Sequence, residues 1–106
     1  MGIGMWATKK IEKTPKTAMQ MERHLKGIAN HWRIEILLLV SERGGITLDG
    51  IVQSVQGSYP TIAEHVSRLV RAGLVEKKYK GRNVAHNLTS YGKKFVSFLI
   101  TFKHYA

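Results

Sequence analysis

Side chains that support acid–base, metal or nucleophilic chemistry are few in this sequence, and they are scattered. The chain has one aspartate (Asp49), six glutamates, five histidines and no cysteine. No two histidines stand four residues apart with an acidic partner, the spacing with which one helix binds zinc. No nucleophile–base pair, acid pair or glycine-rich phosphate loop is present. We therefore expect no enzymatic activity, no metal site and no cofactor, and the lack of cysteine excludes thiolate chemistry.

A second set of side chains, in the segment 59–72, is suited to binding rather than catalysis. Apolar residues at positions 62, 66, 69 and 70 recur at helical spacing and predict a helix with one buried stripe. The opposite face carries an aromatic ring, short polar groups and arginines, which can contact base edges and phosphates in the major groove of DNA. The candidate DNA-binding residues here are Ser58, Tyr59, Thr61, Glu64, His65, Arg68 and Arg71.

After Gly73 the apolar spacing changes and predicts strands instead of helices. The segments 74–80 and 84–88 predict two short strands, and the residues 81–83 between them predict a tight hairpin turn. The cations of this hairpin could contact the DNA backbone or enter a minor groove, with the segment 76–84 making the contacts. They are Lys77, Lys78, Lys80 and Arg82, of which the last three are candidate DNA-binding residues.

The elements before this segment must hold it in place. Thr14 and Pro15 predict the cap and first position of a helix that ends near Asn30. The next helix, about 31–42, is apolar over most of its surface, which predicts the central core helix. A third helix, about 48–55, has Thr47 as its predicted cap, with Ile46 and Ile51 placed as a hydrophobic staple.

Two short helices joined by a glycine-containing turn and followed by a hairpin predict a winged helix-turn-helix. The predicted fold is mainly α with a small β-hairpin (α+β), in one domain over 14–106. The helix-turn-helix covers about 47–73 and the wing about 74–88. Residues 1–13, with a lysine cluster and weak periodicity, are expected to form a flexible basic arm.

The last predicted helix, about 90–104, is expected to mediate dimerisation. Its aromatic stripe lies on one face, and so small a domain cannot easily bury both this stripe and that of the first helix. We therefore expect a homodimer, which would place two helices of the 59–72 type about 34 Å apart, one turn of DNA. The predicted interface residues are Met21, Leu25, Tyr91, Phe95, Phe98, Leu99 and Phe102.

The overall charge points to an anionic partner. The chain has 106 residues and a formal net charge of +10, and the segment 58–94 holds eight basic and two acidic residues. Double-stranded DNA is the expected partner. No apolar run is long enough to span a bilayer, and the first residues lack a signal-peptide pattern. The expected location is the cytoplasm, in association with the nucleoid.

Four segments also resemble a known family. The segments 25–37 and 58–75, the second with its Ala-Gly-Leu-Val exit, resemble ArsR-like winged-helix repressors, and 81–84 resembles the wing tip. The segment 88–92 resembles the region after the wing in many winged regulators, including MarR-like ones, which are the second choice. The resemblance implies a homodimeric DNA-binding transcription regulator, in which Tyr59, Thr61, Glu64 and His65 match DNA-facing residues. The chain lacks the cysteine pair and the Asp/His ligand spacing of the metal sensors in that family.

Two alternatives to a sequence-specific regulator stay open. One is a winged-helix interaction module that binds protein or RNA partners, which would favour an apolar or acidic face where this chain has Thr61, Arg68 and Arg71. The other is a sequence-independent, chromatin-type DNA binder, which would show little preference among duplexes. The operator, any small-molecule effector, and the choice between repression and activation do not follow from the sequence.

Overall fold

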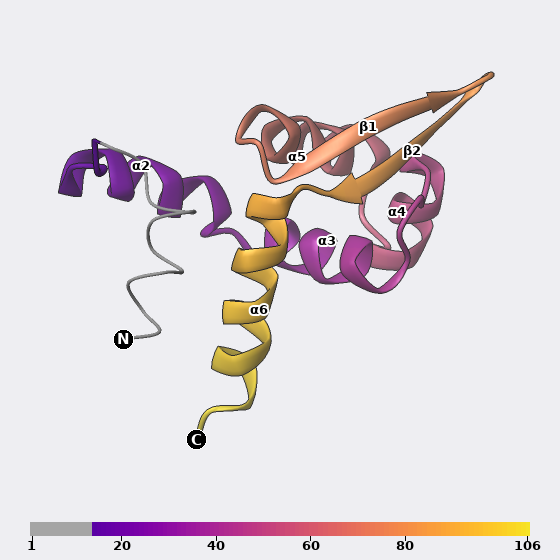
Figure 1. Cartoon of the computed structure of the whole chain (residues 1–106). Helices are drawn as coiled ribbons and strands as arrows, with labels where there is room; N and C mark the ends of the chain where they lie inside the picture. The colour runs from indigo at the N-terminus through magenta and orange to yellow at the C-terminus, as the bar shows by residue number, and fades with distance from the viewer. Residues whose placement is uncertain (1–13) are drawn as a thin grey trace.

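The computed structural model describes residues 14–106, so the predicted basic arm over 1–13 lies outside the described residues. These residues form five helices and one antiparallel hairpin (Figure 1). The predicted α+β winged helix-turn-helix is confirmed. The elements in chain order are α2 (Ala18–Ile28), α3 (His31–Glu42), α4 (Leu48–Val55), α5 (Tyr59–Arg71), β1 (Val75–Lys80), β2 (Asn83–Leu88) and α6 (Ser90–His104).

Helix α3 lies at the centre of the core, as its sequence predicts. Ile36 and Leu37 are fully buried in it, and α4, α5, β2 and α6 all pack against this helix. Ile51 of α4 and Ile62 of α5 are equally inaccessible and complete the core between the three helices. Burial of these side chains fixes the angle between α4 and α5.

Each of the first three described helices starts after a residue whose side chain caps it, and for one of them the predicted cap is wrong. Asn30 caps α3 and Thr47 caps α4, and the predicted bounds of both helices are confirmed. The start predicted at Thr14 and Pro15 is wrong, because Thr17 caps α2. Its hydroxyl accepts a hydrogen bond from the Gln20 amide at 3.1 Å, and the Gln20 side chain accepts one from the Thr17 amide at 2.8 Å. This reciprocal box satisfies two backbone amides at the start of the helix.

The hairpin turn is one residue shorter than the sequence predicts. Lys80 pairs with Asn83, so Gly81 and Arg82 alone form the turn, and Gly81 adopts the left-handed conformation with φ of +62°. Two-residue turns with positive φ match the twist of antiparallel strands. At the other end of β2, His86 is buried, and its Nδ1 atom lies 2.9 Å from the Ile46 carbonyl oxygen. This contact and the Ile46–His86 bridge join the base of the wing to the start of α4.

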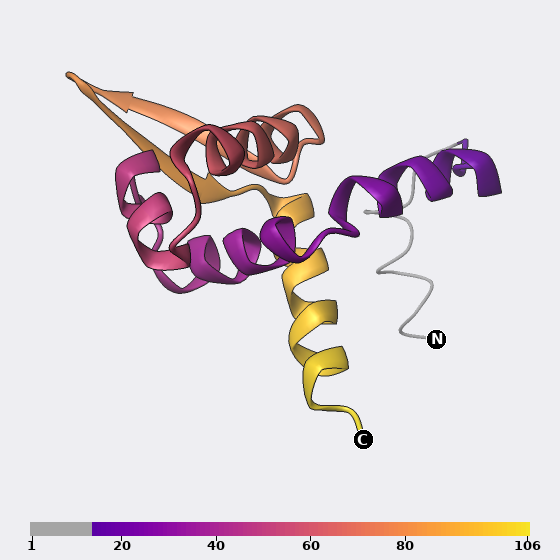
Figure 2. The same cartoon turned by 180° about the vertical axis from the view of Figure 1, so that it is seen from behind.

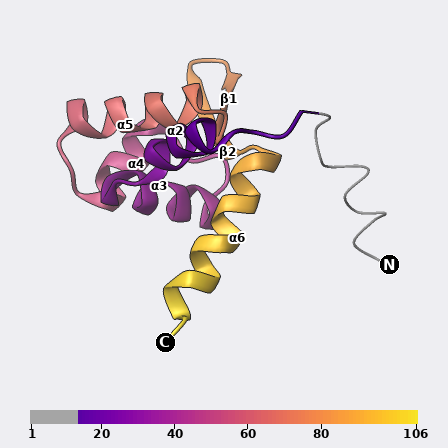
Figure 3. The ribbon, with the colours of Figure 1, turned by 90° about the vertical axis from the view of Figure 1, so that its left-hand side faces the viewer.

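Helices α2 and α6 extend away from this body in different directions. Figures 1 and 2 show α2 projecting to one side and the C-terminal turns of α6 projecting below, and Figure 3 shows the same arrangement side-on. Only Ile28 is buried in α2, and only Gly92 and Val96 are buried in α6. No helix in the described residues is long and apolar enough to cross a membrane.

Candidate nucleic-acid interface

The turn between α4 and α5 sets how α5 is presented. Gln56 ends α4 in the left-handed conformation, with φ of 58°. Gly57 follows, where a Cβ atom would come within 2.6 Å of the Ile62 side chain. Ser58 is the N-cap residue, and Pro60 lies in the first turn of α5. With Ile62 and Leu69 buried against the core, the other side of α5 faces outward.

This outward side, the α5 outer face, consists of five of the predicted residues. All five are exposed, and Tyr59 stands at the N-terminal end with about half of its surface accessible. The Ser58 hydroxyl donates a hydrogen bond to the Thr61 hydroxyl at 2.8 Å. Polar and cationic groups with this exposure suit contacts in a DNA groove. The members of the α5 outer face are Tyr59, Thr61, Glu64, Arg68 and Arg71.

Glu64 holds the two arginines of the α5 outer face together. Its Oε2 atom accepts a hydrogen bond from Nε of Arg68 at 3.0 Å and lies 3.6 Å from Nη2 of Arg71. The hydrogen bond from Arg68 is the main reason that the pKa of Glu64 lies below its ordinary value. Glu64 is therefore a carboxylate that orients two guanidinium groups, and all three groups are solvent-exposed.

His65 is placed differently from the other predicted residues. It is partly buried on the flank of α5, where its Nδ1 atom lies 3.0 Å from Nη1 of Arg33. Arg33 is only 7% exposed, and its Nη2 atom donates to the Lys26 carbonyl at 3.2 Å. Burial, followed by the positive charges of Arg33 and Arg68, holds the pKa of His65 below its ordinary value. His65 therefore joins α5 to α3, and its Nδ1 is not free to read a base.

Arg33 is not among the residues predicted from the sequence to form the site. The signal available was a lone arginine inside the otherwise apolar stretch 32–40, apart from Glu35. A charged side chain in a core helix is seldom left without polar partners, so its position predicts a buried contact. Which residue supplies that contact depends on tertiary packing, because His65 lies 32 positions away.

The wing presents its cations to solvent. Lys78, Lys80 and Arg82 are all exposed, with Arg82 in the two-residue tip. Tyr79, which is not among the predicted DNA-binding residues, is 72% exposed on the same strand as the lysines. A hollow of about 260 Å³ lies between the wing and the helix-turn-helix, and Tyr59 and Arg82 both line it. The start of α5 and the tip of the wing therefore border one concave surface.

The predicted dimer residues lie on α2 and α6, and we call this set the α2–α6 apolar surface. Leu25 is 57% exposed, Phe98 60% and Phe102 67%. Leu25 and Phe98 also share one shallow apolar hollow, which links the two helices. Next to it, the Tyr91 hydroxyl lies 3.0 Å from Nδ1 of His24. The full set is Met21, Leu25, Tyr91, Phe95, Phe98, Leu99 and Phe102.

Helix α6 packs against the body through its first turns. Val96 of this helix is buried and packs into the core. Gly92 lies close to the Leu74 carbonyl, so α6 approaches the exit of α5 through its smallest residue. Of the predicted stripe, Tyr91, Phe95 and Leu99 are partly buried and pack against the core, whereas Phe98 and Phe102 are exposed. Among the described residues, no group of three histidine, aspartate or glutamate side chains is placed to hold a metal ion.

Comparison with known proteins identifies the fold. No protein-family model and no curated protein sequence matches the chain. Among solved structures, the transcriptional regulator HlyU from Vibrio vulnificus matches with a TM-score of 0.69 at 19% identity, over 96% of this chain and 98% of that one. A homodimeric winged helix-turn-helix DNA-binding domain from Mycobacterium bovis, from a possible ArsR-family regulator, matches with a TM-score of 0.69 at 20% identity, over 78% and 77%.

MarR matches with a TM-score of 0.67 at 20% identity, over 76% of this chain and 62% of that one. ArsR-like and MarR-like structures thus match the chain about equally well. These likenesses establish the winged-helix fold, which the two kinds of regulator share. In the described part of this chain, α4 and α5 follow one another across a short turn, and the hairpin β1–β2 comes directly after α5, which is the element order of that fold.

Proposed function

We propose that this protein is a homodimeric DNA-binding transcription regulator that reads the major groove with α5. The proposal rests on the contrast between the buried apolar side of α5 and its exposed polar side. Ile62 and Leu69 are fully buried, while Thr61 and Arg68 face solvent beside a basic hairpin. In a winged helix-turn-helix this geometry presents a polar helix face to base edges and a cationic wing to the backbone.

The charge distribution supports a nucleic-acid partner over a protein partner. The chain carries a formal net charge of +10, and within 58–94 the basic residues exceed the acidic ones by six. The three candidate cations of the wing are solvent-exposed and have no acidic partner in the described part of the chain. A phosphate backbone binds such cations with release of counterions. An interaction module for protein partners would gain little from a cationic hairpin.

The α2–α6 apolar surface supports a symmetric dimer. Both helices extend from the body and leave leucine and phenylalanine side chains in water, which a second copy would bury. A two-fold axis at this surface gives each half of a DNA site its own α5 and wing. The M. bovis domain with the same fold is described as homodimeric, which adds support by analogy.

A second candidate function is binding to DNA without sequence preference. The Glu64 contacts favour it, because they draw Arg68 and Arg71 into one cluster on the α5 outer face. If that cluster contacts phosphates only, base reading is left to Tyr59 and Thr61. Selection of bound duplexes from a random pool separates the two functions. We expect enrichment of an inverted repeat with half-sites one helical turn apart, whereas an unchanged pool would establish the second function.

A further inference from the structure

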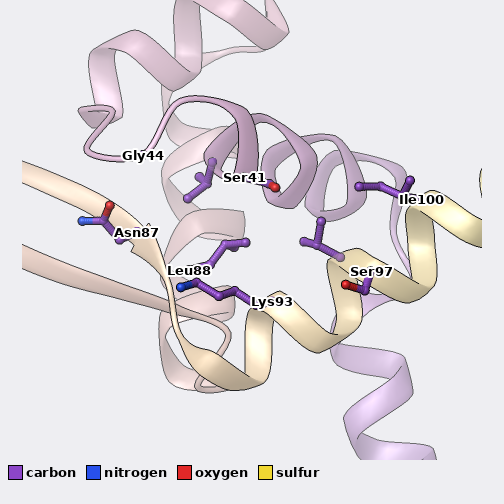
Figure 4. A pocket seen from close by; sticks show the side chains of 9 residues that line it. Ser41, Gly44, Asn87, Leu88, Lys93, Ser97 and Ile100 are labelled. Carbon is purple, nitrogen blue, oxygen red and sulfur yellow. The ribbon is translucent and has the colours of Figure 1, made fainter.

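A pocket of about 410 Å³ lies where α3, β2 and α6 meet, and no residue of α5 lines it. Its volume falls within the range typical of small-molecule sites. Figure 4 shows side chains from α3 and α6 converging on the space between the two helices. The lining residues are Val40, Ser41, Gly44, Asn87, Leu88, Lys93, Val96, Ser97 and Ile100.

The floor of this pocket is apolar. Val40 and Val96 are almost fully buried, and Leu88 is partly buried and packs on the core. Ile100 extends the apolar lining toward the outer end, where it is half exposed. A ligand with an apolar body would remove the accessible parts of these side chains from water.

The rim of the pocket is polar, and its polar side chains are available to bind a ligand. Ser41, Asn87, Lys93 and Ser97 line it, and within the described part of the chain no other group hydrogen-bonds to or pairs with their side chains. Asn87 lies against Gly44, where a Cβ atom would stand 3.1 Å from its Oδ1 atom, so the backbone there leaves room for the amide. Figure 4 shows Lys93 running from α6 toward the end of β2.

The pocket lining carries a positive charge and no negative one. Lys93 is its single ionised residue, and none of the lining residues is acidic. A cation above an apolar floor, with amide and hydroxyl groups around it, complements a ligand that carries one anionic group on an apolar body. The geometry points to a binding site for small apolar carboxylates, with the carboxylate at Lys93 and Asn87 and the apolar body over Val40 and Val96. The proposed ligand site is present in the protein without DNA, so its test does not depend on whether the protein binds DNA.

Binding of 3-phenylpropionate to the free, full-length protein tests this site by two-dimensional amide NMR. We expect saturable shifts at millimolar concentrations that centre on Asn87, Leu88, Lys93 and Ser97. The neutral amide of the same acid should bind more weakly, and acetate, which lacks the apolar body, should give no saturable shifts. Equal binding of the acid and its amide would overturn the assignment of a carboxylate site, and absence of saturable shifts would overturn the site altogether.

Three variants test the place of binding. Lys93→Gln removes the charge and should weaken binding roughly three- to tenfold, as expected for one solvent-accessible charged contact. Lys103→Gln makes the same change on the same helix outside the pocket and should leave binding unchanged. Ser97→Leu keeps the charge but fills the space and should abolish binding. If Lys93→Gln and Lys103→Gln bind equally well, or if Ser97→Leu binds normally, the ligand is elsewhere and the proposal is wrong.

Discussion

Nη1 of Arg33 lies 3.0 Å from Nδ1 of His65, and this contact joins the core helix α3 to the flank of α5. Because a guanidinium group only donates hydrogen bonds, Nδ1 must act as the acceptor, and His65 is neutral in this arrangement. The second guanidinium nitrogen donates to the Lys26 carbonyl near the end of α2. One buried side chain thus links three helices, and the link depends on the protonation state of His65.

We predict that the protein loses stability as the pH falls below about 6.5, the ordinary pKa of histidine. The pKa of His65 is lowered in the folded protein by burial and by the charges of Arg33 and Arg68. The unfolded chain therefore binds more protons between the two pKa values, and the free energy of unfolding rises with pH across that interval. The charge of Glu64 raises the pKa of His65 and that of His31 lowers it, both by less than burial, Arg33 and Arg68 do.

Urea unfolding between pH 5 and 8, with the histidine ring signals followed by NMR, checks this prediction. His65→Gln should remove the part of the pH dependence that comes from His65. A His65 ring that titrates at or above the ordinary histidine pKa would contradict the prediction, whatever the unfolding curves show.

We predict that Gly92→Ala destabilises the protein by about 1–3 kcal/mol or more, because its Cβ would collide with the backbone carbonyl of Leu74. A backbone group cannot move aside as a flexible side chain can. Gly27→Ala is the matched control. Gly27 also lies in a helix, but its nearest obstacle is 3.9 Å away, so the change should be neutral or stabilising by up to about 1 kcal/mol. Thermal unfolding of both variants gives the comparison, and similar effects would refute the close approach of α6.

The sequence predicts local features of this fold better than its distant contacts. The starts of α3, α4 and α6 follow from Asn30, Thr47 and Thr89, because each cap is satisfied within three residues of itself. The start of α2 was misplaced because two cap patterns, at Thr14 and at Thr17, compete within one turn. Periodicity likewise identified the buried stripe of α5, with Ile62, Val66 and Leu69.

Features that depend on packing between distant segments were not predictable. The close approach at Gly92 and the inward position of Val96 depend on how α6 crosses the exit of α5, and no local pattern encodes this. His65 had the residue type and helical position of a DNA contact, but Arg33, far away in the sequence, occupies its Nδ1 atom. The pocket beside Lys93 arises from three separate elements and left no motif in the sequence.

We predict that Phe98→Glu converts a dimer to a monomer. Phe98 is 60% exposed on the α2–α6 apolar surface, and a buried carboxylate at a symmetric interface would occur twice without a partner. Tyr79→Glu is the control, because it places the same charge at another exposed aromatic position, on the wing. Sedimentation at tens of micromolar should show a dimer for the control and a monomer for Phe98→Glu. A monomeric parent protein would reject the proposed dimer.

We predict a steep salt dependence of DNA binding. If the basic surface of a dimer neutralises about six to ten phosphates, affinity falls by roughly 10³–10⁵ between 50 and 200 mM salt. Arg82→Ala removes one exposed cation at the wing tip and should lower the slope of log affinity against log salt by about one. Lys103→Ala, at the far end of α6, should leave the slope unchanged. A salt-independent affinity would favour the alternative of a protein-binding module.

The last prediction separates base reading by α5 from backbone contact by the wing. Thr61 and Arg68 lie on the α5 outer face, so Thr61→Ala and Arg68→Ala should each cost about 1–3 kcal/mol on the preferred duplex and little on random DNA. Arg82→Ala should weaken binding to both duplexes alike.

A further variant, Glu64→Gln, tests the role of Arg68. Arg68 is ion-paired with Glu64, and Glu64→Gln removes this ion pair while it keeps the arginine. If Arg68 contacts only phosphate, freeing it strengthens binding to both duplexes equally. If it reads a base in the orientation that Glu64 sets, only the specific complex weakens. Unchanged ratios of specific to random affinity in all of the α5 variants would show that α5 is not the reader, and the protein would then bind DNA without sequence preference.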